Sequence, residues 1–315
     1  MKILVSDPLS NVGIEIFKNT PGIEVDVKTD LSQSELEDII GVYHGLSIRS
    51  KTKVTEQVIS KAKNLKVIGR AGIGLDNVDI PAATRANIAV MNTPFGNTIT
   101  TAEHAIAMIM ALSRNIPRAT ATLKDGEWEK KNLKGREIFN KTLGLVGIGN
   151  IGKIVADRAM GLKMKVIGCD PYLDPEAIEK MGIRHVNFDE ILAESDYISI
   201  HTPKTPETTN LFNKETLSRM KQGAMLINCA RGGLVNEDDL YEVLKSNHLG
   251  GAALDVFATE PPGKIKLMDL DNFICSPHLG ASTHEAQDNV ARDVANQITE
   301  YLLTGKAPNI VNQKK

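Results

Sequence analysis

The sequence predicts an α/β protein with two doubly wound parallel-sheet domains. In the first third of the chain, short apolar strands alternate with amphipathic helical segments, a rhythm typical of a parallel sheet covered by helices. The rhythm resumes after a glycine-rich turn at residues 147–152, where an apolar strand leads into a helix. A chain of 315 residues is long enough for two such domains.

The first domain is predicted from five apolar stretches and the segments between them. We expect strands at residues 2–5, 23–27, 45–48, 66–68 and 88–91, and helices at residues 32–40 and 55–62. The first strand is followed by Ser6, Asp7 and Pro8 and therefore lacks a glycine fingerprint. Residues 92–97 are rich in turn formers and predict a connection out of this domain.

Two unusual segments follow that connection. Residues 98–115 are apolar on nearly all sides and predict a buried helix, packed between domains or between subunits. Residues 118–137 are charged, contain the only tryptophan, Trp128, and predict an excursion that reaches a neighbouring subunit. We therefore expect a homodimer or a higher homo-oligomer.

The second domain is predicted to lie within the first in chain order. Its strands are expected at residues 141–146, 165–169, 197–200, 224–227, 252–254 and 273–275. Residues 285–303 have helical periodicity, end at Gly305 and return to the first domain. The predicted division is 1–97 with 285–315 for one domain, and 98–284 for the other.

Composition excludes several classes of protein. The formal net charge of -2 argues against nucleic-acid binding, and no apolar run approaches the length of a membrane span. The three cysteines are scattered, which argues against a disulfide framework and a cysteine-rich zinc site. The apolar run at residues 2–5 is too short for a signal peptide. We expect a cytoplasmic protein without a metal site.

The turn at residues 147–152 has the Gly-x-Gly-x-x-Gly spacing of a dinucleotide-binding fingerprint. Gly147 permits the tight turn, Gly149 lets the backbone approach a pyrophosphate, and Gly152 lets the helix lie close to the strand. We expect this helix to begin at about Lys153 and to present its free N–H groups to the phosphates.

An acidic residue follows at the spacing that suits NAD. Asp170 ends the next strand and is placed to hold a ribose 2′-hydroxyl and to repel a 2′-phosphate. No Arg or Lys follows until Lys180, so NAD is favoured over NADP. The alternative is that Asp170 is a solvated acid at the end of a strand.

Three side chains at successive strand ends suit the oxidation of an alcohol beside a carboxylate. His278 suits a base because its ordinary pKa lies near neutral pH, and Arg231 offers a fork that matches a carboxylate. Glu260 would orient His278 and favour its protonated form. His201 is the rival base, although its neighbours favour the nicotinamide-ribose side, and His104 is expected to be structural.

Several motifs carry a resemblance to a known family, in order along residues 1–305. They lie at residues 48–52, 70–79, 92–97, 145–152, 228–233, 253–257 and 277–283. On these motifs the chain resembles the D-isomer-specific 2-hydroxyacid dehydrogenases, and within them the branch that acts on D-3-phosphoglycerate. The resemblance implies a Rossmann-type NAD domain inserted into a flavodoxin-like substrate domain, in a short form without the C-terminal regulatory domain of longer relatives.

The resemblance also implies site residues. The catalytic set is Arg231, Glu260 and His278. The NAD contacts are Gly147, Gly149, Asn150, Ile151, Gly152, Asp170, His201, Thr202, Cys229, Ala230, Arg231, Asp255, His278, Gly280 and Ala281. The substrate contacts are Arg49, Ser50, Arg70, Gly72, Ile73, Gly74, Asn97 and Lys130, with Arg49 and Arg70 near the phosphate and Lys130 reaching a neighbour's site.

The implied activity is NAD-dependent oxidation of D-3-phosphoglycerate to 3-phosphohydroxypyruvate, the first step of serine biosynthesis. One alternative is a hydroxypyruvate or glyoxylate reductase, or another D-2-hydroxyacid dehydrogenase, with the same chemistry and a different side-chain pocket. A more distant alternative is a scaffold that senses NAD(H) and binds partner proteins with little turnover.

Overall fold

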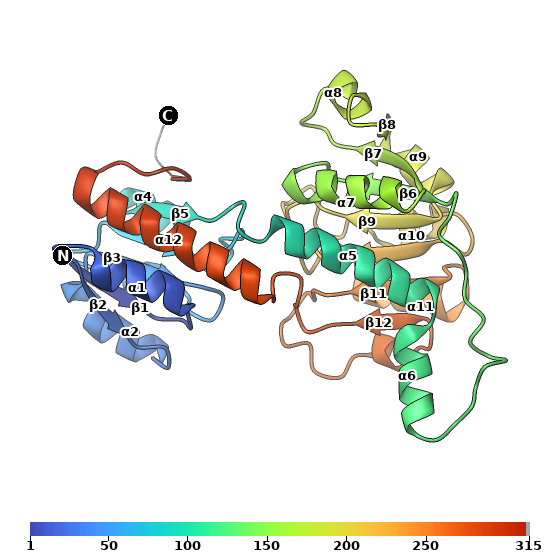
Figure 1. Ribbon diagram of the computed structural model, residues 1–315, viewed down its shortest axis with the longest axis horizontal. Coiled ribbons are helices and arrows are strands. Elements are labelled where there is room, and N and C mark those ends of the chain that lie inside the picture. The colour runs from blue at the N-terminus through green and yellow to red at the C-terminus, as the bar shows by residue number, and fades with distance from the viewer. Residues whose placement is uncertain (313–315) are drawn as a thin grey trace. The chain divides into compact units, whose positions relative to one another are not determined.

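The computed structural model describes residues 1–312, which divide into two compact units. Unit 1 comprises Met1–Asn97 together with the chain from Ser282 onward, and unit 2 comprises Thr98–Ala281. Figure 1 shows that each unit is a sheet with helices on both faces. The predicted fold class, two parallel-sheet α/β domains, is confirmed.

Unit 1 contains a parallel sheet in the order β2-β1-β3-β4-β5, which is the flavodoxin-like order. Its strands are β1 (Lys2–Val5), β2 (Glu24–Val27), β3 (Gly45–Ile48), β4 (Val67–Arg70) and β5 (Ala89–Asn92). Its helices are α1 (Asn11–Asn19), α2 (Gln33–Ile39), η1 (Ile40–Val42), α3 (Glu56–Lys61), α4 (Ile80–Arg85) and α12 (His284–Thr304).

Alternation along β1 shows how this sheet is buried on both faces. Ile3 and Val5 pack into a cluster with residues of α1 and α12, whereas Leu4 packs into a cluster on the opposite face with residues of α2 and α3. All three side chains are fully buried. The return of the chain through α12 therefore completes the core of unit 1.

Unit 2 contains a parallel sheet in the order β12-β11-β10-β9-β6-β7-β8. Its strands are β6 (Thr142–Val146), β7 (Lys165–Cys169), β8 (Arg184–His185), β9 (Tyr197–Ile200), β10 (Met225–Asn228), β11 (Gly251–Leu254) and β12 (Phe273–Cys275). Its helices are α5 (Thr98–Ser113), α6 (Ile116–Lys124), α7 (Asn150–Gly161), α8 (Pro175–Glu179), α9 (Phe188–Glu194), α10 (Lys214–Arg219), α11 (Glu237–Lys245) and η2 (Lys266–Asp269). If β6 is taken as the first strand of the unit, the strands from β8 to β11 follow the Rossmann order 3-2-1-4-5-6. Strand β12 is added at the edge beyond β11.

Several sequence-based expectations differ from the structure. The helix of the glycine fingerprint begins at Asn150 and not at Lys153, because Gly149 is its N-cap and Lys153 is the donor of its first backbone hydrogen bond. Helix α5 buries residues such as Ala102, Ala105 and Ile109 and exposes Ile99 and Met110 within this chain, so its predicted packing between domains or between subunits stays a prediction. The predicted excursion begins with a helix, α6, before the chain continues without helix or strand to β6. The second segment of unit 1 begins at Ser282, three residues before the expected boundary at residue 285, because Thr283 caps α12.

Candidate active site

The glycine fingerprint lies where the strand order of unit 2 reverses, between β6 and β9. Gly147 has φ +93° and its N–H donates to the Cys169 carbonyl at 3.0 Å. A Cβ on Gly152 would lie 2.3 Å from the Gly147 carbonyl oxygen, so any side chain there would force the turn away from α7. Gly147 and Gly152, which the sequence analysis identified, thus allow the tight turn between β6 and α7.

This turn fits an NAD pyrophosphate. A Cβ on Gly149 would meet no atom within 4 Å, so the backbone there is open to a ligand. Asn150 and Ile151 are the first residues of α7, whose free N–H groups and dipole favour phosphate. The expected NAD contacts at the turn therefore lie together at one helix N-terminus.

Asp170 lies at the carboxyl end of β7, beside the fingerprint turn. Its carboxylate accepts hydrogen bonds from the backbone N–H of Ile148 at 2.8 Å and of Tyr172 at 2.9 Å. A carboxylate has about four acceptor positions, so two backbone bonds leave room for ribose hydroxyls. Asp170 therefore holds the turn in shape as well as lying where a ribose acceptor is expected.

His201 follows β9 and packs against the same turn. Its N–H donates to the Val146 carbonyl, and its ring hydrogen-bonds with the Ser199 hydroxyl at 2.8 Å. Burial lowers the pKa of His201 to about 4, so its imidazole is neutral at pH 7. A ring with this pKa accepts protons weakly, which argues against His201 as the base. Thr202 is half-buried next to it.

The loop after β10 carries Arg231 and is shaped by buried Asn228. The Asn228 side chain accepts from the Ala230 N–H at 3.0 Å and donates to the Arg231 carbonyl at 2.8 Å. The Arg231 guanidinium donates to the Ala230 carbonyl at 2.7 Å. Cys229 is buried at the start of this loop.

The structure brings His278 and Glu260 together as a dyad. Nδ1 of His278 lies 2.7 Å from Oε2 of Glu260, and the other carboxylate oxygen accepts the Phe257 N–H at 3.0 Å. Both side chains are partly exposed, at 48% and 38%. His278 has φ +54°, an uncommon backbone conformation for a residue with a side chain. This is the geometry of a histidine oriented by a carboxylate.

Asp255 fixes the loop that carries His278. Its fully buried carboxylate accepts the N–H groups of Leu279 and Gly280, each at 2.7 Å, and the Ser276 hydroxyl at 2.6 Å. Nε2 of His104 on α5 lies 3.3 Å from the same carboxylate and 3.0 Å from the Ser276 hydroxyl. His104 is thus engaged in a local network, in line with the structural role expected for it.

The pKa of Asp255 lies below its ordinary value. Burial alone would raise it, but the hydrogen bonds from His104, Ser276 and the two backbone N–H groups together lower it. Asp255 is therefore charged at neutral pH, and in this structure its carboxylate is directed at the protein backbone. Ala281, also expected to contact NAD, is the last residue of unit 2.

In unit 1 the two arginines expected near the phosphate stand at neighbouring strand ends. Arg70 ends β4 opposite Ile48 of β3, and Arg49 follows Ile48 directly. Both are half-buried, and Ser50 beside them is exposed. Two guanidinium groups at one carboxyl edge favour an anionic ligand.

Two residues to which the sequence analysis gave no role, Asp7 and Asn77 of the motif at residues 70–79, hold the Arg49 loop. Buried Asp7, two residues after the end of β1, accepts the Arg49 N–H at 2.5 Å and the Thr52 hydroxyl at 2.8 Å. The Asn77 amide donates to the carbonyls of Arg49 at 2.7 Å and Thr52 at 2.6 Å. The only sequence signal was the position of Asp7 at the end of the first strand.

The other expected substrate residues are spread over both units. Gly72 has φ +148°, and a Cβ on it would lie 2.6 Å from Nη1 of Arg70, so only glycine suits the position beneath this arginine. Ile73 and Gly74 follow in the same loop, and Asn97 is buried at the last residue before unit 2. Lys130 is exposed in the segment between α6 and β6 of unit 2.

Three free thiols stand at strand ends of unit 2. Cys169 ends β7, Cys229 follows β10 and Cys275 ends β12. Burial raises the pKa of all three thiols, that of Cys169 to about 12. Among residues 1–312 no cluster of His, Cys, Asp or Glu could hold a metal ion, and no helix is long and apolar enough to cross a membrane.

The chain was compared with known proteins. Residues 106–280 match the family model described as "D-isomer specific 2-hydroxyacid dehydrogenase, NAD binding domain", which confirms NAD as the expected cofactor. The chain is 50% identical over 311 residues to the D-3-phosphoglycerate dehydrogenase of Synechocystis sp. (strain ATCC 27184 / PCC 6803 / Kazusa), covering 99% of this chain and 56% of that relative. The chain thus spans little more than half the length of that protein.

Solved structures agree with this relationship. The TT0316 protein from Thermus thermophilus is similar with a TM-score of 0.90 and 34% identity, covering 99% of this chain and 100% of that chain. A glyoxylate reductase from Paecilomyes thermophila is similar with a TM-score of 0.91 and 27% identity, covering 100% of this chain and 99% of that one. With the family model matching more than half of its residues, the chain belongs to the D-isomer specific 2-hydroxyacid dehydrogenase family.

Proposed function

We propose that this protein oxidises D-3-phosphoglycerate to 3-phosphohydroxypyruvate with NAD, as the first step of serine biosynthesis. The observation that carries the chemistry is the 2.7 Å contact of His278 with Glu260 in the unit that holds the dinucleotide fingerprint. The name of the Synechocystis relative, a D-3-phosphoglycerate dehydrogenase, supports the substrate.

His278 is the proton acceptor in this proposal. An ionised Glu260 only accepts hydrogen bonds, so Nδ1 of His278 carries a proton and donates it to Oε2 of Glu260. This leaves Nε2 with a lone pair that takes the proton of the substrate hydroxyl. Glu260 then stabilises the imidazolium that forms, and the same pair returns the proton in the reverse reduction.

Arg231 binds the substrate carboxylate in this proposal. Its guanidinium presents two parallel donors to a carboxylate, which fixes the orientation of the neighbouring carbon. When bound, NAD accepts the hydride that leaves this carbon. The substrate loses a hydride and a proton in total and becomes the 2-oxo acid.

The phosphate is assigned to Arg49 and Arg70 of unit 1. Their positions at neighbouring strand ends support this role, because a phosphate dianion is matched by guanidinium donors. We assign the backbone N–H groups of residues 72–74 and the side chain of Asn97 to the remaining polar atoms of the substrate. Lys130 is proposed to reach the site of a second subunit.

The test is an absorbance assay of NADH formation by the purified chain. D-3-phosphoglycerate, D-glycerate and D-lactate are compared as substrates under identical conditions. We expect a clear preference for the phosphorylated acid. Preference for an unphosphorylated acid would reject the phosphate assignment and leave the dyad and NAD in place.

A second candidate is a glyoxylate or hydroxypyruvate reductase. The observation in its favour is the similarity to the glyoxylate reductase from Paecilomyes thermophila, which spans the whole chain. The two candidates share the dyad and differ in the side-chain pocket, so the same assay separates them. A scaffold that only senses NAD(H) would give no rate with any of these acids.

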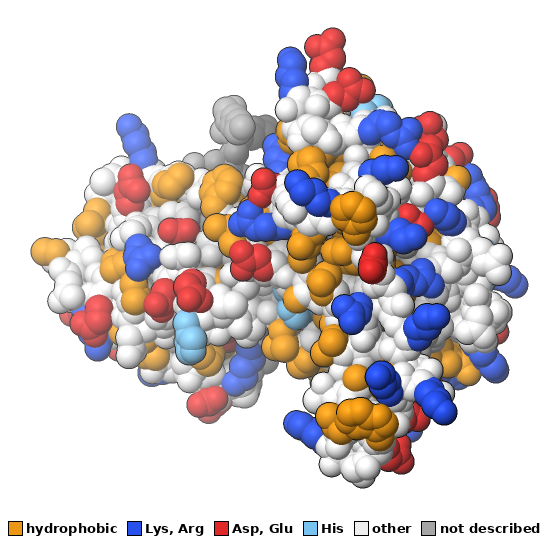
Figure 2. Space-filling view, turned by 45° about the vertical axis from the view of Figure 1, so that its right-hand side comes forward, with side chains coloured by type: hydrophobic (Ala, Val, Ile, Leu, Met, Phe, Trp, Pro, Cys, Tyr) orange, Lys and Arg blue, Asp and Glu red, His pale blue; other side chains and the backbone are white. Residues whose placement is uncertain are grey.

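We also propose a homodimer in the cytoplasm. Helix α6 and the segment after it expose Ile116, Leu123 and Trp128, at 53%, 58% and 80%. Figure 2 shows hydrophobic side chains gathered among Lys and Arg side chains on this face. Such a surface is typical of a subunit contact, and a monomer mass at all concentrations would contradict it. The free thiols support a reducing compartment.

A further inference from the structure

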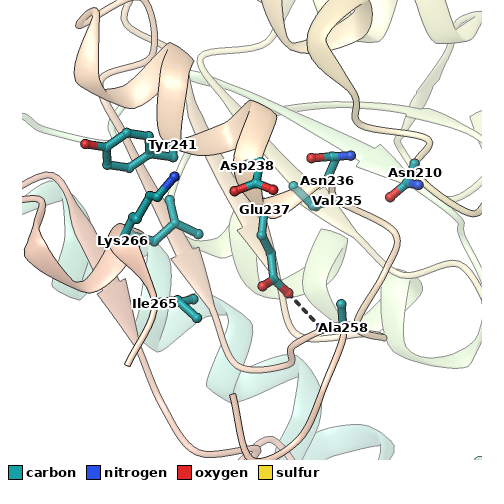
Figure 3. Close-up of a pocket in the computed structure, with 10 residues that line it drawn as sticks. Asn210, Val235, Asn236, Glu237, Asp238, Tyr241, Ala258, Ile265 and Lys266 are labelled. Carbon is teal, nitrogen blue, oxygen red and sulfur yellow. Dashed lines mark hydrogen bonds between the residues drawn. The ribbon is translucent and has the colours of Figure 1, made fainter. Parts of the chain in front are cut away.

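The middle of the loop that carries Glu260 has little support from packed side chains, although Phe257 before it is buried and Ile265 after it packs against the core of unit 2. Residues 258–261 are exposed, and the loop that continues from them to η2 borders a cavity of about 270 Å³. Ala258, Ile265 and Lys266 line this cavity on the loop side, and Glu237 lines it on the side of α11 (Figure 3). Hydrogen bonds must therefore supply much of the positional restraint on this loop.

Glu237 supplies such a bond. Its Oε1 accepts the Ala258 N–H at 2.7 Å, across 21 residues of chain, as the dashed line in Figure 3 shows. The preceding N–H, that of Phe257, donates to Glu260 itself at 3.0 Å. Two consecutive backbone N–H groups are therefore held by carboxylates: that of Phe257 by Glu260 of the same loop, and that of Ala258 by Glu237 of α11.

Glu237 is not needed to cap its own helix. The side chain of Asn236 accepts the Asp239 N–H at 3.0 Å and serves as the N-cap of α11. Acids in the first turn of a helix usually interact with its dipole in solvent. Glu237 instead reaches out of the helix to a loop, whereas Asp238 beside it is exposed.

Residues 232–237, the stretch of chain that ends at Glu237, also hold the Glu260 loop at a second point, Gly232. A Cβ on Gly232 would lie 1.7 Å from the Phe257 carbonyl oxygen and 2.8 Å from the Ala258 nitrogen. The peptide between Phe257 and Ala258 is thus held between Gly232 and Glu237. Arg231 precedes Gly232, so one segment sets the position of Arg231 and of the loop that carries Glu260.

We propose that Glu237 is a positioning residue that holds the Glu260 loop in register with His278 and Arg231. The inference rests on the proposed function, since it assigns Glu237 to the dyad of that reaction. Without the bond to Ala258, the loop loses one of its restraints beside the cavity, and the Glu260 carboxylate is held less firmly against Nδ1 of His278.

The test compares Glu237→Ala, Glu237→Gln and Asp238→Ala. Glutamine keeps an oxygen that accepts the Ala258 N–H, and Asp238→Ala removes the same charge from the same turn. We expect Glu237→Ala to lower kcat about tenfold with KM for NAD changed less than twofold, because small displacements of catalytic groups cost rate. Glu237→Gln and Asp238→Ala should stay within about twofold of the parent kcat.

Two further measurements separate positioning from a general structural effect. The tautomer of His278, read from its imidazole nitrogen NMR signals with His278→Gln to assign them, should shift away from the Nδ1–H form in Glu237→Ala, because a fixed carboxylate accepts the Nδ1 proton. In a Glu260→Gln background, Glu237→Ala should cause little further loss of kcat. The proposal is overturned if Glu237→Ala matches Asp238→Ala in kcat and in the His278 tautomer, or if Glu237→Ala lowers kcat equally in the parent and in the Glu260→Gln background.

These results also separate this inference from the proposed function. A parent protein that oxidises no 2-hydroxy acid would reject the proposed function, and the His278 tautomer would still test the role of Glu237. An active parent with an unaffected Glu237→Ala variant would reject only the role of Glu237.

Discussion

The two units use the same device for different purposes. In each, a buried aspartate at a strand end accepts backbone N–H groups of a loop: Asp7 holds the Arg49 loop and Asp255 holds the His278 loop. The partners of Asp7 belong to the loop that it holds. Asp255 also binds Ser276 and is approached by His104 of α5, so its loop is tied to a helix as well.

This difference matches the role proposed for each loop. Attraction between a guanidinium and a phosphate falls slowly with distance, so a long arginine tolerates small movements of its loop. Proton transfer requires hydrogen-bond distance and alignment, and His278 is also held in a left-handed conformation. We therefore expect substitutions in the His278 loop to lower activity more than substitutions in the Arg49 loop.

The largest effect is expected from His278→Ala. Loss of the proton acceptor should lower kcat by about 10²- to 10⁴-fold, measured as NADH formation. NADH binding, followed by fluorescence, should be retained because the fingerprint turn is untouched. Turnover near the parent value would remove His278 from its role.

Asp255→Ala should destabilise unit 2. It leaves the N–H groups of Leu279 and Gly280 without their acceptor, at roughly 1–3 kcal/mol for the buried Gly280 group and less for the partly buried Leu279 group. Chemical denaturation should show a loss of this order in the free energy of unfolding. Asp271→Ala, which removes a surface partner of Arg118, is the matched control and should cost less than about 1 kcal/mol. Equal losses in the two variants would contradict the anchoring role.

Arg49→Ala should act on substrate choice. A charge-assisted hydrogen bond contributes about 1.5–3 kcal/mol, so KM for D-3-phosphoglycerate should rise about 10- to 100-fold. The KM for D-glycerate should change little, because that acid has no phosphate. A similar rise for both acids would remove the phosphate assignment.

Asp7→Ala should give a smaller version of that effect. Arg49 and Thr52 are half-buried, so water can replace part of the lost bonding, and the stability cost should be near ~1 kcal/mol. The KM for the phosphorylated acid should rise by less than in Arg49→Ala. Asp30→Ala serves as control, since its exposed side chain pairs with Lys51 at the surface. A larger KM rise than in Arg49→Ala would show that Asp7 does more than hold the loop.

The smallest effect is expected in the pH dependence of stability at acidic pH. Because the pKa of Asp255 is lowered on folding, its charged form stabilises the protein above the unfolded pKa of about 3.9, and this stability is lost as the pH falls through the folded pKa. Stability should therefore decline more steeply below pH ~4 in the parent than in Asp255→Asn. Parallel curves would show that Asp255 does not contribute to acid sensitivity.

Local signals in the sequence predicted the fold class and the fingerprint. Two of the constraints on the turn are local, since Gly147 adopts φ +93° and a Cβ on Gly152 would lie 2.3 Å from the Gly147 carbonyl oxygen, whereas the close approach of His201 to Gly147 is a tertiary contact. Strand β8 was missed because two residues, Arg184 and His185, are too few to show periodicity. Its existence depends on pairing with β7, which is a tertiary property.

The supports of the site could not be predicted in the same way. Asp255 was expected to bind NAD from its place in a motif, but its bonds to Leu279 and Gly280 join residues 24 and 25 positions apart. Asp7 reaches Arg49 across 42 residues, and Glu237 reaches Ala258 across 21. Acids at strand ends and helix starts are common, and only the folded chain shows which ones hold a loop.

The three thiols at the strand ends have a consequence for the redox chemistry of the protein. Thiolates react with peroxides and alkylating agents, whereas protonated thiols do so slowly. Because burial raises the pKa of Cys169, Cys229 and Cys275, all three remain protonated at neutral pH. The carboxyl edge of the unit 2 sheet therefore carries three sulfur atoms in their less nucleophilic, protonated form, of which Cys275 is the exposed one.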